Sequence, residues 1–141
     1  MMSIVTTGAE TGYYVDVFRS RKEKGGDKMH DYFYHNLGQT LTLTAADGSD
    51  LNLQPTEELA FAGAHLYAYS YLYDKKVAAT NKDVKATFTI DMKDKDGDDI
   101  YMNLWMKGEP DREVFTALAP MTEGLSRTPN MPYNIKEQPT L

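Results

Sequence analysis

The chain has 141 residues and no cysteine, and its 15 Lys and Arg against 21 Asp and Glu give a formal net charge of −6. A chain of this length makes one domain that buries roughly two-thirds of its unfolded surface, and without cysteine it forms no disulfide, Cys-ligated metal site or thiol nucleophile. No apolar run approaches the ~18 residues of a membrane helix, and the negative charge opposes nucleic-acid binding. We therefore expect a single folded domain over 1–141 with neither nucleic acid nor membrane as a partner.

The first two predicted strands enclose a glycine turn. Residues 13–21 and 29–35 both alternate with period 2, as a strand with two different faces does. The Gly-Gly pair at 25–26 between them can adopt the positive φ that a tight hairpin turn requires. We therefore predict an antiparallel hairpin in which Asp16 lies opposite His35.

More short alternating runs follow, separated by turns rich in Gly and Asp. The predicted strands are 40–44, 50–53, 86–90, 100–106 and 113–118. Turns at Asp47-Gly48 and over 93–99 are expected to join the first two and the next two as hairpins. Many short strands with such turns are typical of an all-β fold, so we predict an antiparallel β-sandwich or stacked-sheet domain.

Two other segments are less regular. Residues 56–61 have helix-forming composition with Thr56 as a candidate cap, so one short helix is an alternative there to continued β structure. Next, alternating tyrosines predict a strand with an aromatic face, formed by Tyr67, Tyr69, Tyr71 and Tyr73.

The last part of the chain, 120–141, contains several prolines and is predicted to be a loop-rich tail. A strand pattern begins at 139–141. Because a sheet left one strand short exposes an unpaired edge, we expect the chain to be an excised part of a longer protein.

Residues 30–35, His-Asp-Tyr-Phe-Tyr-His, form the most chemically reactive stretch. His30, Tyr32 and Tyr34 share one face of the predicted strand. Aromatic rings stack on sugars, and imidazole and phenol groups exchange protons and hydrogen bonds. These three residues are therefore the candidate substrate-binding residues.

The opposite face of the same stretch favours a structural role. Asp31 and His35 lie about 13 Å apart along a strand, too far to form a catalytic dyad. His30 and His35 point to opposite faces, so they cannot share a metal ion. We predict instead a polar network across the hairpin, made by Asp16, Arg19, Asp31 and His35. The sequence predicts no catalytic residue, metal or cofactor in this chain.

Three further motifs have simple structural explanations. The acidic loop at 93–99 resembles a calcium loop in part, but Met92 and Asn103 occupy its first and last ligand positions, so a solvated turn is expected. The tyrosines at 67–73 can stack on sugars or pack between sheets, and packing is favoured. Trp105 lies among apolar residues and is predicted to be in the core.

The spaced residue types along nearly the whole chain resemble the β-sheet domain of heparinase II/III-like polysaccharide lyases. The matching segments are 14–19, 25–26, 30–38, 86–88, 100–106, 108–110, 113–115 and 131–133. The resemblance implies a C-terminal domain of stacked antiparallel sheets, preceded in the parent protein by an N-terminal α/α toroid that this chain lacks. It also implies an acidic, uronate-containing polysaccharide as the partner of the parent, and a location in the periplasm or outside the cell.

The chemistry that the resemblance implies is β-elimination, in which a base removes the C5 proton of a uronate and an acid protonates the leaving oxygen. In the family the toroid supplies the Asn, His and Tyr of this chemistry. A further His and the metal-binding residues lie early in the sheet domain, ahead of the strand that corresponds to 13–21, so the resemblance implies that this chain contains none of these groups. This chain alone is therefore expected to be inactive, as a non-catalytic part of such a lyase.

Two alternatives follow from the residues themselves. A stand-alone carbohydrate-binding module would expose Tyr32 and Tyr34, or the tyrosines at 67–73, as a platform. A structural or interaction β-sandwich would bind no ligand and would pair an open sheet edge with a second copy.

Overall fold

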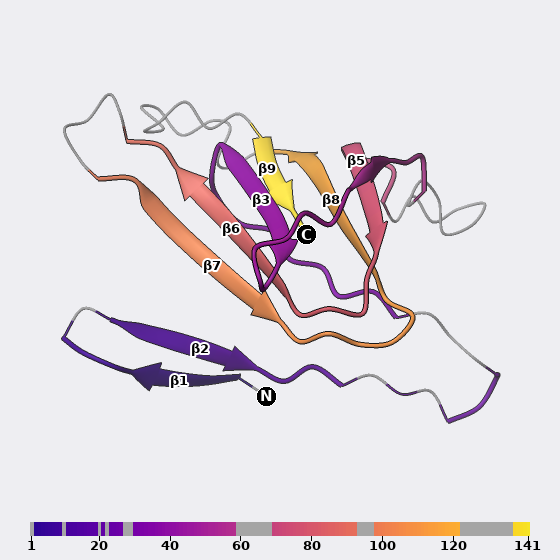
Figure 1. Cartoon of the computed structure of the whole chain (residues 1–141), viewed down its shortest axis with the longest axis horizontal. Coiled ribbons are helices and arrows are strands. Elements are labelled where there is room, and N and C mark those ends of the chain that lie inside the picture. The colour runs from indigo at the N-terminus through magenta and orange to yellow at the C-terminus, as the bar shows by residue number, and fades with distance from the viewer. Residues whose placement is uncertain are drawn as a thin grey trace. The chain divides into compact units, whose positions relative to one another are not determined.

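All secondary structure in the described residues is β. A computed structural model describes residues 2–9, 11–19, 21, 23–26, 30–58, 69–92, 98–121 and 137–141. Its strands are β1 (Met2–Thr6), β2 (Gly12–Asp16), β3 (Thr40–Ala45), β4 (Gln54–Pro55), β5 (Tyr73–Ala79), β6 (Val84–Ile90), β7 (Ile100–Met106), β8 (Glu113–Pro120) and β9 (Glu137–Thr140) (Figure 1). The predicted all-β, antiparallel fold is confirmed. The described segments include no helix that could cross a membrane.

The first of two compact units, Met1–Tyr32, contains a two-stranded sheet. β1 pairs with β2 in antiparallel register, with Met2 opposite Asp16. The predicted hairpin, with Asp16 opposite His35, is therefore wrong. The glycines at 25–26 do have positive φ, 104° and 73°, but the chain around them forms a bend and not a strand pair. The alternation of residues 13–16 is compatible with a strand on either side, so it could not decide between the two pairings.

The second unit, Phe33–Leu141, contains two sheets. The three-stranded sheet has the order β3-β6-β7, and Figure 1 shows these strands side by side. β6 and β7 form the predicted hairpin, with Ala86 opposite Leu104. Alternation sends Ala86 and Phe88 of β6 inward, where both are buried. The alternate residues of β6 and β7 therefore lie on the outer face of this sheet.

The four-stranded sheet has the order β4-β5-β8-β9. The outer edge of β9 is also bonded, because Tyr34 and Leu141 exchange two backbone hydrogen bonds of 2.9 Å. The amide of Asn36 adds a third, to the carbonyl of Pro139, at 3.4 Å. The unpaired edge expected at the C-terminal strand is therefore not found, and the predicted loop-rich tail ends in a strand whose two sides are both occupied.

The Asp47-Gly48 turn forms, with Gly48 at φ 83°, but it does not join a hairpin. Residues 50–53 are not a strand, because Asp50 accepts a bond from the Asn52 amide (2.8 Å) and bends the chain. The segment then enters β4, which pairs with β5 of the other sheet. The turn thus carries the chain from one sheet to the other.

Side chains from both sheets meet in one core, as in a sandwich. Its buried members are Leu43, Ala78, Val84, Ala86, Phe88, Val114 and Leu141. A second cluster lies on the other face of the four-stranded sheet, where Leu72 covers Ala117 and Ala119, with Phe33 and Tyr69 packed against them. The face of the four-stranded sheet that points away from the shared core is therefore covered at these alanines.

Three predicted segments fall partly outside the described residues. Residues 56–58 are not helical, since the Thr56 hydroxyl accepts a bond from the Glu58 amide in a local turn, and 59–61 lie outside the described part. Of the tyrosine strand, 66–68 lie outside it as well. Residues 69–71 form a turn, so the predicted strand is wrong there, and β5 begins only at Tyr73. In the tail, 122–136 lie outside the described residues.

Candidate functional site

The first candidate residues lie in the Met1–Tyr32 unit. The Tyr32 hydroxyl donates a hydrogen bond to Asp16 Oδ2 (3.4 Å), and its ring lies 5.8 Å from that of Phe18 at a tilt of 57°. Tyr32 is 37% exposed and His30 is also exposed. The two substrate-binding candidates in this unit are therefore accessible to a ligand.

The remaining candidates lie in the other unit and are tied to its C-terminal strand. The Tyr34 ring packs on Phe88, with 5.6 Å between centroids, and its burial raises the pKa of Tyr34. His35 Nδ1 lies 2.8 Å from Thr140 Oγ1. Tyr34 thus takes part in the core, and it is less accessible than Tyr32.

The predicted polar network has partners that the sequence did not indicate. Asp16 bonds to Tyr32 and His35 bonds to Thr140, a buried residue 105 positions away. Arg19 and Asp31 are exposed. Hydrogen bonding among the four residues of the network stays a prediction.

The hydrogen bonds around Thr140 favour one tautomer of His35. The Thr140 hydroxyl also lies 3.3 Å from the Gln138 carbonyl, to which it donates its one hydrogen. Both bonds are satisfied when the Nδ1–H of His35 donates to Thr140 Oγ1. Partial burial lowers the pKa of His35 and so favours the neutral ring, in which Nε2 is the acceptor.

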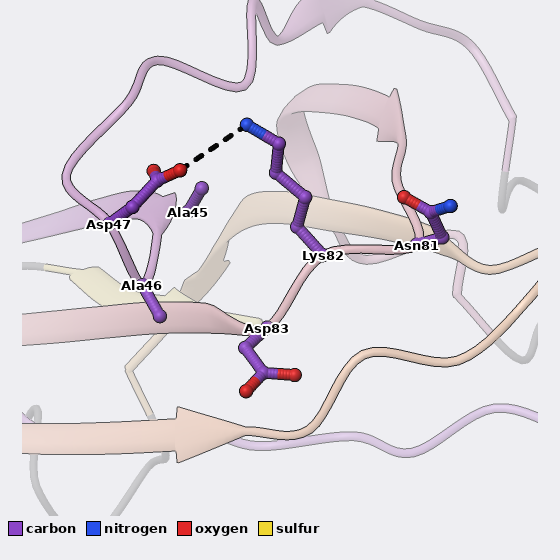
Figure 2. A pocket seen from close by; sticks show the side chains of 6 residues that line it. All are labelled: Ala45, Ala46, Asp47, Asn81, Lys82 and Asp83. Carbon is purple, nitrogen blue, oxygen red and sulfur yellow. Dashed lines mark hydrogen bonds and ion pairs between the residues drawn. The ribbon is translucent and has the colours of Figure 1, made fainter.

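A shallow pocket of about 400 Å³ lies where the β3 turn meets the loop between β5 and β6. Its lining is Ala45, Ala46, Asp47, Asn81, Lys82 and Asp83. Figure 2 shows Lys82 extended toward Asp47, at 3.5 Å, while Asp83 points away from this pair. Two hydrogen bonds from Ser49, helped by Lys82, lower the pKa of Asp47 to about 2.

The polar groups around this pocket hold neighbouring loops together. Asp83 Oδ1 accepts the amide of Gly108 at 2.7 Å. Arg112 donates from its two terminal nitrogens to the carbonyls of Lys82 and Lys107, both at 2.6 Å. The lining contains no nucleophile–base pair, and its charged groups already bond to protein atoms. The pocket is thus a loop junction whose polar groups serve the fold.

The acidic loop before β7 is only partly described, since 93–97 lie outside the described residues. Asp99 accepts bonds from the Met92 amide (3.0 Å) and the Tyr101 hydroxyl (3.3 Å), and its charge is the main cause of the raised pKa of Tyr101. Among the residues that the structure describes, no three His, Asp or Glu side chains are grouped as metal ligands.

The expectation that Trp105 lies in the core is wrong. Trp105 is 57% exposed and Tyr101 is 58% exposed, on the outer face of the three-stranded sheet. The apolar neighbours of Trp105 in β7 alternate with it and face the core instead. The signal was present in the sequence, because period 2 places Trp105 with Tyr101 and opposite Met102, Leu104 and Met106.

The tyrosines at 69–73 do not form a flat platform. Tyr69 stacks on Phe33, with centroids 4.7 Å apart and planes at 6°. Tyr71 and Tyr73 are 44% and 40% exposed, but one lies in a turn and the other at the start of β5. Their rings therefore do not continue a common aromatic face from Tyr69.

Comparison with known proteins gives one informative relative. An endo-acting ulvan lyase of Formosa agariphila is 34% identical over 125 residues, which are 86% of this chain and 15% of that enzyme. The chain thus spans about a seventh of the length of this relative. No protein-family model matches, so the heparinase II/III-like type stays a prediction, and no solved structure matches either. The chain is a β-sandwich domain related to part of a polysaccharide lyase.

Proposed function

We propose that the chain is a non-catalytic part of the β-sheet domain of a polysaccharide lyase that acts on uronate-containing polysaccharides, of the heparinase II/III-like type. One observation carries this proposal: the similarity to an endo-acting ulvan lyase extends over 86% of this chain and covers 15% of that enzyme. A single sandwich that makes up so small a share of an enzyme is suited to supporting or extending a cleft whose other residues come from elsewhere in the parent.

In this proposal the β-elimination groups belong to the rest of the parent, including its toroid. The base, the acid and the group that neutralises the uronate carboxylate must converge on one sugar. The contribution of this chain is contact with the polysaccharide through His30, Tyr32 and the accessible part of Tyr34. The tilted contact between the rings of Tyr32 and Phe18 supports this role, because it holds an exposed phenol ring in place.

The location that fits this function is outside the cytoplasm, in the periplasm or beyond the cell. An enzyme that cleaves a polymer internally must meet the intact polymer, which is too large to cross a membrane unaided. The same argument makes the acidic polysaccharide, and not a short sugar, the partner of the parent protein.

The proposal has two measurable parts. With ulvan, heparan sulfate or alginate, the chain alone should release no unsaturated uronate, followed by its ultraviolet absorbance. In gel electrophoresis, an acidic polysaccharide in the gel should retard the chain, and His30→Ala or Tyr32→Ala should weaken the retardation. Tyr14→Ala is the matched control, since Tyr14 is 67% exposed in the same unit. Turnover by the chain alone would contradict the non-catalytic assignment, and unchanged retardation of both variants would contradict the assigned contacts.

A further inference from the structure

The outer face of the three-stranded sheet is built as three rows of three side chains. The cross-strand partners place Thr40, Thr89 and Tyr101 in one row, Thr42, Thr87 and Asn103 in the middle row, and Thr44, Lys85 and Trp105 in the third. We call these nine residues the outer face. Each outer row ends in an exposed aromatic ring on β7, and the middle row is entirely polar.

The two rings are spaced for an extended ligand. Tyr101 and Trp105 lie four residues apart on one strand, or about 13 Å, a span of a few sugar rings. Between them the Thr87 hydroxyl and Asn103 Oδ1 are hydrogen-bonded at 2.8 Å, which orients the amide. Aromatic faces that flank hydroxyl and amide groups match a sugar chain, whose apolar ring faces alternate with hydroxyls.

The charge on the outer face also selects its ligand. Although the whole chain carries −6, no Asp or Glu is among the nine residues, and Lys85 lies directly opposite Trp105. At the other end, Asp99 bonds to the Tyr101 hydroxyl and places a negative charge there. An acidic ligand is therefore expected with its carboxylate or sulfate at the Trp105 end and neutral hydroxyls at the Tyr101 end.

The geometry points to the outer face as a binding platform for an acidic polysaccharide, with Trp105 and Tyr101 as stacking residues and Lys85 as the anion contact. A buried protein interface would need a more apolar centre than a row of Thr42, Thr87 and Asn103. This inference deepens the proposed function, because it names a second polysaccharide contact. It does not depend on His30, Tyr32 or Tyr34.

Trp105 is the one tryptophan of the sequence, so intrinsic fluorescence reports directly on this face. Titration of the chain with ulvan should shift the Trp105 emission to shorter wavelength and protect it from quenching by acrylamide. Trp105→Ala and Tyr101→Ala should each lower the affinity for an acidic polysaccharide, measured by gel retardation, about tenfold, because each removes one stacking contact. Both side chains are exposed, so thermal melting should change little and confirms that each variant is folded.

Lys85→Gln should reduce the preference for ulvan over a neutral glucan and flatten the salt dependence of binding. Tyr71→Ala, an exposed tyrosine away from this face, is the matched control and should bind as the unmodified chain does. Emission and quenching of Trp105 that stay unchanged at saturating ulvan would overturn the platform.

The outcomes separate the two claims. If Trp105→Ala binds normally while His30→Ala or Tyr32→Ala binds weakly, the platform is wrong and the proposed function stands. If the chain cleaves ulvan by itself but loses binding with Trp105→Ala, the platform stands and the non-catalytic assignment is wrong. Self-association that shifts the Trp105 emission without any polysaccharide would overturn the platform in favour of a contact between copies.

Discussion

Phe88 is the side chain on which the two-sheet core depends most, so Phe88→Ala is the strongest test of the fold. Phe88 is 1% exposed at the centre of β6, between Leu41 of β3 and Met102 of β7, and its ring contacts Tyr34. Removing a buried phenyl ring costs about 3–5 kcal/mol in free energy of unfolding, since apolar burial is lost and a cavity remains. That is a large share of the about 5–15 kcal/mol that stabilises a domain.

Urea denaturation followed by far-ultraviolet circular dichroism measures this loss, and the melting temperature should fall by about 10 °C or more. Tryptophan fluorescence is the poorer probe, because Trp105 is already exposed in the folded state. The control is Thr89→Ala, the next residue of β6, whose side chain lies on the outer face and should change the free energy of unfolding by about 1 kcal/mol or less. A loss for Phe88→Ala as small as that of the control would refute the shared core.

Three further predictions follow, two on the pH dependence of stability and one on the tight packing of Gly108 against the backbone. The pKa of Asp47 is lowered from 3.8 to about 2, so the ionised carboxylate stabilises the fold above pH 3.8 and this stabilisation is lost as the pH falls toward 2. Asp47→Asn should therefore make the melting temperature less dependent on pH between 3.8 and 2. The pKa of His35 lies below 6.5, so protonation favours the unfolded chain and stability should decline as the pH falls below 6.5; an imidazole NMR titration with a midpoint at or above 6.5 would contradict this. A Cβ on Gly108 would collide with the backbone carbonyl of Asn81, so Gly108→Ala should lower the free energy of unfolding by about 1–3 kcal/mol in urea denaturation.

Local patterns predicted the parts of the fold that depend on local pairing. The strands at 86–90 and 100–106 are joined by one loop, and their alternation alone was enough to identify the β6–β7 hairpin. By contrast, β5 reads Tyr-Asp-Lys-Lys-Val-Ala-Ala, which has no regular alternation, and its strand is defined by β4 and β8 on either side. β9 contains Pro139, a residue that usually argues against an inner strand, and its other partner is residues 34–36.

The candidate site divides in the same way. The exposure of Tyr32 and His30 follows from their polar character, but the partner of His35 is set by the tertiary fold and could not be read locally. Trp105 is different, because period 2 already assigned it to the face opposite the core. Its large apolar surface outweighed that period in the sequence argument, and the structure shows that the period was the better guide.

The position of β9 between β8 and residues 34–36 has a consequence for how the molecule is assembled. The bond between His35 and Thr140 joins positions 105 residues apart, whereas β6 and β7 meet across one loop. Contacts so distant in sequence form slowly, because the chain must lose the entropy of closing a large loop before these contacts stabilise it. The β6–β7 hairpin is therefore expected to form early on the folding pathway. Phe88 should become fully buried only when β9 joins the four-stranded sheet on the other side of the core.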